Sequence, residues 1–470
     1  MAAPSALLGL LAAPVFVSAC RNGPEPAGTG DTVESAPELG PCEDAEGQIE
    51  GDVANGVRTR PSACGRLELT AVTVTPGAAT FEATFDGTGR QIRPTVRATA
   101  GVDTVDQVAW AGTFWLDGAA PLEVATWPRQ VGDPIVEGRL EGTVRASGAI
   151  LVGRSDGSWL FVGAVAQQID ELTIEVTAPD QLRLVFGGND ARTVEEGRVL
   201  TYDRFVMGVG PDAQGLLTMW QADTIESGSS QPFDGALGIY GPPPNRAAVS
   251  AMADADPEKH VQAVLTDGAD PTLGGLIRAS GRAWMVRGRP FHDDGGPLDP
   301  TDPADRARIQ RRAEALVAAG VDGAWIEGAA TLAEPQPRAA SDSSGIAAYR
   351  RALAAFRAGF GDRPVVVQGG LPLPSIGVVD AVVPPPDQPV LDQLATASSL
   401  ASLTPWGLRI GPIPLSTLSD EAFARDLTVA LVSGGAWHVG APPSSDRQRA
   451  WLFGPGGLAP LREVAGGASA

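Results

Sequence analysis

Apolar segments alternate with helical stretches from residue 232 toward the C-terminus, and this alternation constrains the fold more than any other feature. The helical stretches are clearest at residues 303–319, 344–360 and 420–432. We expect strands at the apolar segments, which are residues 236–240, 260–267, 283–291, 321–327, 364–368, 378–383, 407–413 and 436–439. Eight strands with helices between them are typical of a (β/α)8 TIM barrel, which we predict over residues 232–455. Its active site is then expected at the C-terminal ends of the strands.

Residues 65–231 have a different pattern, in which apolar and polar residues alternate in short runs such as 67–72 and 80–85. Turn-forming glycine, serine, asparagine and aspartate residues separate these runs. A block of such strands without helices predicts a β-sandwich. Four tryptophans fall inside it, namely Trp110, Trp115, Trp127 and Trp159. We interpret them as core residues, with sugar stacking as the alternative.

The N-terminus has the features of a secreted precursor. An apolar stretch at residues 7–17 is too short to span a bilayer, and the small-residue sequence VSAC ends at Cys20. This string resembles a bacterial lipobox, in which the cysteine becomes the lipidated first residue of the mature protein. We therefore expect a signal peptide at residues 1–19 and a lipid anchor on Cys20. The expected location is the cell envelope, at the periplasmic face or the outer-membrane surface.

Residues 20–64 are rich in glycine, proline, alanine and acidic residues and lack an apolar period, which predicts a flexible tether. Cys42 and Cys64 are the two cysteines that remain once Cys20 carries lipid. In an oxidising compartment they are candidates for one disulfide, and two free thiols are the alternative. Residues 456–470 are expected to form a C-terminal tail.

Composition and motifs exclude several classes of function. A net charge of −21 argues against binding to nucleic acid, because phosphates require a positive surface. The three histidines, His260, His292 and His438, lack metal-ligand spacing, so we expect no metal and no cofactor. The sequence also has no serine-hydrolase elbow, P-loop or dinucleotide fingerprint after a strand.

Carboxylates that follow the predicted barrel strands are the candidates for chemistry. They are Asp267 after the second strand, Asp293, Asp294 and Asp299 after the third, Glu327 at the end of the fourth and Asp387 after the sixth. A glycosidase requires two carboxyl groups, one as acid and one as nucleophile or base, and Glu327 and Asp387 can form that pair. A helix cap or a solvated loop charge is the alternative for each of them.

Several motifs in order resemble those of glycoside hydrolase family 36, the bacterial α-galactosidase family. They are LDPTDPADR at 298–306, AGVDGAWIE at 319–327, QGGLPL at 368–373, SIGVVDA at 375–381 and ALVSGG at 430–435. The resemblance covers roughly residues 65–453. It implies an N-terminal supersandwich-like β-sandwich followed by the barrel, and a retaining two-carboxylate mechanism on α-linked sugars.

The resemblance also implies roles for individual residues. Glu327 takes the place of the family nucleophile, Asp387 that of the acid/base, and Asp267 keeps one substrate-binding carboxylate. Trp325 replaces the family lysine, and Asp299 lies in the LDP motif; we expect both to contact substrate. One hypothesis is an α-galactosidase-like envelope enzyme, and the other is an inactive glycan-binding or scaffold lipoprotein that keeps the fold. The sugar, the linkage and the oligomeric state stay open.

Overall fold

The computed structural model describes residue 42 and most of residues 49–453, and residues 40–470 belong to one compact unit. The segments outside the description are 1–41, 43–48, 53–55, 60–61, 76–78, 86–90, 99–101, 131–132, 134–135, 227–237, 244, 385–408, 411–412, 433–436, 441–442 and 454–470. The predicted signal peptide, Cys20, Asp387 and the C-terminal tail therefore lie outside the described residues. None of the helices in the described ranges is long and apolar enough to cross a membrane.

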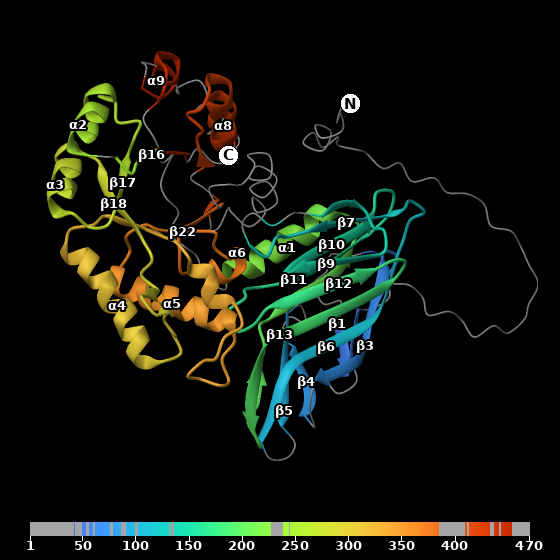
Figure 1. Ribbon diagram of the computed structural model, residues 1–470. Helices are drawn as coiled ribbons and strands as arrows, with labels where there is room; N and C mark the ends of the chain where they lie inside the picture. The colour runs from blue at the N-terminus through green and yellow to red at the C-terminus, as the bar shows by residue number, and fades with distance from the viewer. Residues whose placement is uncertain are drawn as a thin grey trace, which may run out of the picture. The chain divides into compact units, whose positions relative to one another are not determined.

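Two antiparallel sheets make up the N-terminal part (Figure 1). In order across the sheet, the first consists of β1 (Ile49–Asp52), β2 (Gly56–Thr59), β3 (Gly65–Thr75), β6 (Val102–Leu116), β13 (Gln181–Glu195), β12 (Leu172–Thr177) and β9 (Thr143–Ser147). The second consists of β14 (Val199–Thr201), β5 (Gln91–Ala98), β15 (Phe205–Gly210), β11 (Trp159–Ala164), β10 (Ala149–Arg154), β7 (Leu122–Thr126) and β8 (Glu137–Arg139), with β4 (Ala79–Phe85) paired to β5.

The two sheets pack face to face through aromatic side chains, as expected for a β-sandwich. Phe205 of the second sheet contacts Trp110 and Phe186 of the first, with ring centroids 6.3 and 5.5 Å apart. Trp110 and Trp127 are buried, as core packing requires. Trp115 is different, because 47% of it is exposed.

Strands β1 and β2 lie in the segment that the sequence assigned to the tether. They pair antiparallel with each other, and β2 pairs with β3, so the sheet begins by residue 49. These strands are short and polar, and their place at the sheet edge comes from backbone pairing rather than from an apolar pattern. A disulfide joins Cys42 to Cys64, with Cα atoms 5.2 Å apart, just before β3.

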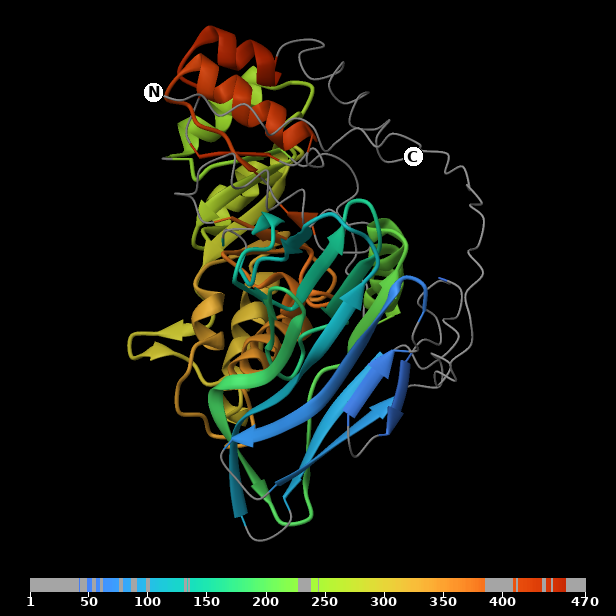
Figure 2. The same ribbon diagram turned by 90° about the vertical axis from the view of Figure 1, so that its right-hand side faces the viewer.

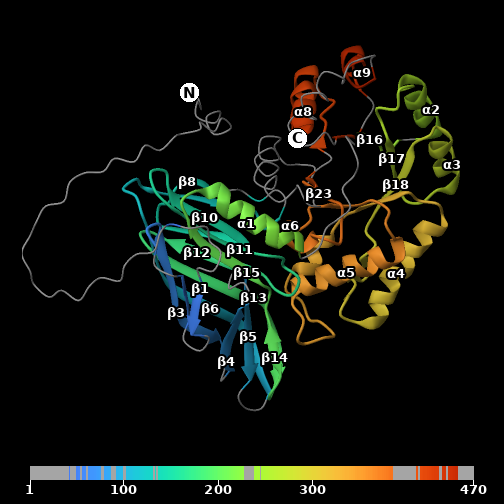
Figure 3. The ribbon, with the colours of Figure 1, turned by 180° about the vertical axis from the view of Figure 1, so that it is seen from behind.

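Helix α1 (Ala213–Glu226) lies where the sequence predicted strands alone. It packs against β11 and β15, and Figure 3 shows it running across the sandwich. Its buried residues are Leu216, Trp220, Asp223 and Thr224, which have helical spacing. Two of the four are polar, so the apolar period is hidden in the sequence. The Trp220 Nε1–H donates to the Ala164 carbonyl oxygen at 2.7 Å and satisfies the buried indole.

The C-terminal part is built on a curled, entirely parallel sheet. In order across the sheet, its described strands are β24 (Arg409–Ile410), β23 (Ala381–Val383), β22 (Val365–Gln368), β21 (Gly323–Ile326), β18 (Ala283–Gly288), β17 (Ala263–Asp267), β16 (Gly238–Tyr240), β26 (Trp437–Val439) and β25 (Ile413–Pro414). The segment predicted as the seventh strand, 407–413, corresponds to β24 and β25, which pair with β23 and β26 at opposite edges. The two edges of the sheet are thus neighbours in the sequence.

Helices lie outside this sheet, as Figures 1 and 3 show. They are α2 (Arg246–Ala255), α3 (Pro271–Ala279), α4 (Pro303–Ala318), the 3-10 helix η1 (Ala329–Ala333), α5 (Gly345–Phe360), α6 (Pro372–Ser375), α8 (Asp420–Val432) and α9 (Asp446–Phe453). The three clearest predicted helices appear as α4, α5 and α8. A hairpin of β19 (His292–Asp293) and β20 (Gly296–Pro297) stands out from the loop after β18, in yellow in Figure 2.

An apolar cluster fills the inside of the parallel sheet. Its members come from alternate positions of six strands and are Ile239, Ala263, Leu265, Met285, Trp325, Val366, Ala381 and Val383. Residues on the opposite faces of the same strands, such as Val264 and Val367, belong to the core shared with the helices. Because side chains alternate along a strand, the inward positions after this cluster are Asp267, Arg287 and Gln368. The apolar cluster therefore forms the floor beneath a polar rim.

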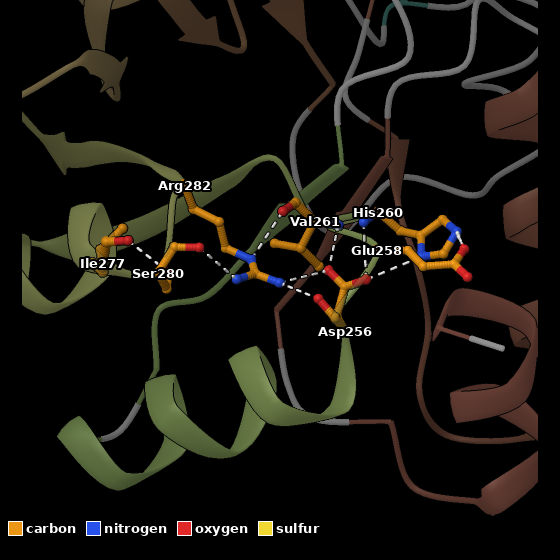
Figure 4. A network of polar contacts seen from close by, with 7 residues as sticks. All are labelled: Asp256, Glu258, His260, Val261, Ile277, Ser280 and Arg282. Atoms are coloured by element: carbon orange, nitrogen blue, oxygen red, sulfur yellow. Dashed lines mark hydrogen bonds and ion pairs between the residues drawn. The ribbon is translucent and has the colours of Figure 1, made fainter. Parts of the chain in front are cut away.

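A buried ion pair occupies the other end of the strands (Figure 4). Asp256 accepts hydrogen bonds from the backbone N–H groups of His260 and Val261 at 2.9 and 2.8 Å. Its carboxylate also contacts His260 Nδ1 and Arg282 Nη2, both at 3.0 Å. These residues precede β17 and β18, at the N-terminal face that stabilises such folds. The Asp–His–Arg cluster therefore has a stabilising role, and the opposite face is the candidate for function.

Candidate functional site

Three neighbouring strands bring Asp267, Arg287 and Glu327 to the same rim. Asp267 ends β17 and lies in register with Arg287 of β18, which lies in register with Trp325 of β21. Glu327 follows β21, and its backbone N–H donates to the Gly288 carbonyl oxygen at 2.9 Å. Two of the carboxylates that the sequence singled out thus lie at the C-terminal ends of adjacent strands.

Arg287 lies between these two carboxylates. Its Nε–H donates to Asp267 Oδ1 at 2.7 Å, and the same nitrogen is 3.7 Å from Glu327 Oε1. Arg289 approaches Glu327 from the loop after β18, with its Nε 3.8 Å from Oε2. The hydrogen bond to Asp267 raises the pKa of Arg287, and the charges of Asp267 and Glu327 also raise it, whereas partial burial lowers it. The guanidinium is therefore a permanent cation beside both carboxylates.

A ligand can reach this group. The side chains of Glu327 and Arg287 are 29% and 30% exposed, and that of Asp267 is 61% exposed. A partly exposed carboxylate held beside a fixed cation is suited to bind hydroxyl groups or to act as a nucleophile.

Trp325 lies below the rim, as part of the buried apolar cluster. Its Nε1–H donates to Gln368 Oε1 at 3.1 Å, and its ring lies 5.2 Å from that of His438. The structure thus places this predicted substrate contact in the floor of the site, with its indole N–H already bonded.

His438 is a neutral part of the same floor. Burial lowers the pKa of His438, and the positive charge of Arg287 also lowers it. These effects outweigh the hydrogen bond to Gly241, which raises the pKa, and leave it at about 4. Its Nε2 lies 2.7 Å from the Gly241 carbonyl oxygen, an acceptor, so we assign the proton to Nε2. A neutral His438 adds no cation to compete with Arg287.

Asp299 has a different role from the one expected. Its Oδ1 accepts hydrogen bonds from the N–H and hydroxyl of Thr301 at 2.9 and 2.7 Å, and its Oδ2 accepts from the Ala339 N–H at 2.6 Å. Burial alone raises the pKa of Asp299, but these hydrogen bonds outweigh it and leave the pKa below its usual value. Asp299 therefore ties the loop after β18 to the segment before α5. Its described hydrogen bonds do not reach Asp267 or Glu327.

Asp387 lies outside the described residues. The described part of the sixth predicted strand, β23, ends at Val383 and runs parallel to β22, so the chain leaves it at the same rim. Among the residues that the structure describes, no group of three or more His, Cys, Asp or Glu could hold a metal ion.

Sequence reasoning missed Arg287 and Arg289. The family motif directs attention to the position within β21 that holds Trp325, where the expected cation is lost. A cation instead reaches the carboxylates from the neighbouring strand β18. The alternation of side chains along β18 could have identified Arg287. Met285 faces inward, and a period of two places Arg287 on the same side of the strand.

Comparison with known proteins supports this architecture through structure rather than sequence. No model of a protein family matches the chain. No curated protein sequence matches it either. Among solved structures, the α-galactosidase of Thermus thermophilus matches over 84% of this chain and 94% of its own, with a TM-score of 0.53 and 13% identity. The family 36 α-galactosidase of Geobacillus stearothermophilus matches over 85% and 74%, with a TM-score of 0.57 and 11% identity.

This chain has the fold of the family 36 α-galactosidases. A third match, the α-galactosidase from Lactobacillus brevis, covers 91% of this chain at a TM-score of 0.55 and 10% identity. The resemblance found in the sequence motifs is thus confirmed at the level of the fold. Identities of this size show a divergent member of the fold and do not transfer an activity. In a family 36 fold, the rim that carries Asp267, Arg287 and Glu327 is the expected place for chemistry.

Proposed function

We propose that this chain binds an α-linked sugar at the rim and hydrolyses its glycosidic bond with retention of configuration. In this proposal the curled sheet closes into the expected eight-stranded barrel. The observation that carries it is the convergence of Asp267 and Glu327 on Arg287 at the C-terminal ends of three adjacent strands. Glu327 supplies one of the two carboxyl groups that a glycosidase requires, and Asp267 and Arg287 supply groups that can bind sugar hydroxyls.

Glu327 is the nucleophile and Asp387 the acid/base in this proposal. The Glu327 carboxylate attacks the anomeric carbon while the Asp387 carboxyl donates its proton to the departing glycosidic oxygen. Water, deprotonated by Asp387, then attacks the glycosyl ester and releases Glu327. Arg287 holds Asp267 through a hydrogen bond and Glu327 through its charge, and Asp267 accepts a hydrogen bond from a sugar hydroxyl.

Structural neighbours indicate which substrates to try first. The Thermus thermophilus enzyme is described in complexes with p-nitrophenyl α-D-galactopyranoside and with stachyose. A Geobacillus stearothermophilus variant is described with raffinose. Oligosaccharides of this kind are therefore the first panel for this chain.

Glycan binding without turnover is the second candidate, and the geometry of the floor favours it. Trp325 is buried in the apolar cluster instead of exposed at the rim, and Asp267 is already engaged by Arg287 at 2.7 Å. A rim whose carboxylates are held by arginines can bind sugar hydroxyls and still lack the freedom needed for chemistry.

Release of sugar from this panel, with Glu327→Gln as the test variant, separates the two candidates. Glu334→Gln is the matched control, because Glu334 is exposed and lies beyond η1. Hydrolysis by the wild type and the control that Glu327→Gln abolishes supports the enzyme, and NMR of the first-formed anomer checks retention. Saturable binding with no turnover supports the second candidate. Turnover unaffected by Glu327→Gln contradicts the assignment of the nucleophile.

We also propose that the chain is a cell-envelope lipoprotein anchored through Cys20, on the basis of the VSAC string. Labelling of cells with a radioactive or clickable fatty acid tests this proposal. The label is expected on the wild type and absent from Cys20→Ser. Label retained by Cys20→Ser, or absent from both, contradicts the anchor.

A further inference from the structure

A cavity of about 300 Å³ lies where the sandwich meets the segment leading into α5, and none of the rim residues Asp267, Arg287 and Glu327 lines it. Gln168 and Ile169 of the sandwich line one side of it, and Asp342, Ser343, Arg350 and Arg351 are among the residues on the other. A volume of this size is at the lower end of the range for small-molecule sites, which is about 300–1,000 Å³. It fits a single sugar-sized molecule.

The N-terminus of α5 forms one side of the cavity. Ser344 caps this 16-residue helix, and its Oγ accepts the Ala347 N–H at 3.1 Å and contacts the Ile169 carbonyl oxygen. Ala347 lines the cavity one turn before Arg350 and Arg351, and its small side chain leaves room in front of the helix end. The N-terminal end of a helix carries a partial positive charge and attracts anions.

Ser343 supplies a second, independent indication of a ligand. The residue lines the cavity and is only 5% exposed, and its Oγ has no hydrogen-bond partner among the described residues. A buried hydroxyl without a partner is unfavourable, and such groups are rare in folded proteins. A ligand in the cavity provides the missing acceptor.

Arg350 and Arg351 bring positive charge to the same place. Arg350 Nη1 donates to the carbonyl oxygens of Pro374 and Ile376 at 2.8 and 2.7 Å. These two bonds fix the guanidinium against the C-terminal end of α6. Arg351 is exposed. Asp342 is the acidic residue among those lining the cavity, so the two arginines outweigh it within the lining, while the charge of Asp203 acts on Arg350 from behind the lining.

The opposite side of the cavity is held in place by a buried carboxylate. Asp203 Oδ2 accepts three consecutive backbone N–H groups, those of Gln168, Ile169 and Asp170, at 2.8, 2.7 and 2.9 Å. These bonds fix the backbone of the segment that faces α5. The cavity is therefore preorganised rather than a loose gap between two parts.

We propose that this cavity binds a small molecule that carries an oxyanion, of the size of a sugar phosphate or a uronic acid. The oxyanion accepts hydrogen bonds from Ser343 Oγ and from the guanidinium groups of Arg350 and Arg351, at the positive end of α5. In a chain with a net charge of −21, this concentration of positive charge selects anions locally. The site is separate from the rim and does not depend on the activity proposed there.

Isothermal titration calorimetry of the purified full chain at about 150 mM salt tests this proposal. The probes are glucose 6-phosphate, glucuronate, inorganic phosphate and glucose. We expect saturable binding of one molecule per chain for at least one anionic probe and none for glucose; the phosphate and carboxylate probes show which oxyanion the site takes. Binding of no anion, or of glucose as tightly as of glucuronate, overturns the proposal.

Variants locate the binding. Arg351→Gln is expected to weaken it at least tenfold, whereas Arg311→Gln, an equal change of charge at an exposed position of α4, leaves it unchanged. Ser343→Ala is expected to weaken it without lowering the unfolding temperature of the ligand-free chain, because it removes an unpaired hydroxyl. Unchanged binding in both Arg351→Gln and Ser343→Ala overturns the proposal. So does binding that Glu327→Gln abolishes, which places the anion at the rim.

Discussion

The Nε–H of Arg287 donates to Oδ1 of Asp267 at 2.7 Å across two neighbouring strands of the parallel sheet. The same nitrogen lies 3.7 Å from Oε1 of Glu327 on the next strand. One guanidinium therefore serves two carboxylates, and it comes from β18 rather than from the position where the family motif carries a lysine. The site thus has a positive charge from Arg287, although Trp325 occupies the lysine position of the family motif.

Replacing Arg287 tests this relationship. Arg287→Gln removes the cation that lies between Asp267 and Glu327. If the chain hydrolyses α-glycosides, kcat/KM should fall about a hundredfold, because both carboxylates lose the group that holds them in position. Arg289→Gln is the control. Arg289 is 69% exposed and lies 3.8 Å from Glu327, whereas Arg287 is 30% exposed and also bonds Asp267 at 2.7 Å. Equal effects of the two changes would contradict a special role for Arg287.

The buried pair of Asp256 and Arg282 should matter for stability and not for sugar binding. Both side chains are almost completely buried, so Asp256→Asn leaves Arg282 without its counter-charge and should lower the free energy of unfolding by about 3–5 kcal/mol. Asp294→Asn, the same change at an exposed position, should alter it by less than about 0.5 kcal/mol. Urea denaturation measures both. A loss below about 1 kcal/mol for Asp256→Asn would refute the structural assignment.

Asp203 should make stability depend on pH. Burial raises its pKa to about 7, against three backbone hydrogen bonds that lower it, whereas an unfolded aspartate titrates near 3.9. The folded chain therefore takes up a proton here before the unfolded chain does. The contribution of this group to stability is fully present below about pH 4 and is lost as the pH rises through 7.

Asp203→Asn should remove that contribution, because the amide oxygen still accepts hydrogen bonds but does not titrate. The difference in denaturation midpoint between wild type and variant, measured from pH 4 to pH 8, should shift in favour of the wild type as the pH falls. A difference that does not vary with pH would show that Asp203 titrates normally.

The Cys42–Cys64 disulfide should stabilise the start of the sandwich. The two cysteines are 22 positions apart, and closing a loop of this length is worth about 3 kcal/mol in the chain-entropy model. The double change Cys42→Ser and Cys64→Ser should lower the unfolding temperature by several degrees. Reduction of the wild type with dithiothreitol should reproduce the effect and leave the variant unchanged. A reductant that shifts both proteins equally would point to another cause.

Local patterns in the sequence located most of the parallel sheet. The segments predicted as strands at 260–267, 283–291 and 321–327 contain β17, β18 and β21, because the backbone geometry of a strand depends on its own residues. The same geometry placed Asp267 and Glu327 at one end of the sheet, since parallel strands end on the same side.

Partners that lie far apart in the sequence were decided by tertiary structure alone. Arg287 binds Asp267, which is 20 residues away, and Asp299 binds Ala339, which is 40 residues away. Strand β2 pairs with β3 through its backbone. Two of the four buried residues of α1 are polar, so its sequence has no clear apolar period. A sequence pattern records which way a side chain faces, whereas a hydrogen bond or an ion pair depends on which neighbour the fold brings within about 3 Å. The sequence therefore determined the framework and the carboxylates of its polar rim, and the packing of the strands decided that Arg287 supplies the positive charge there.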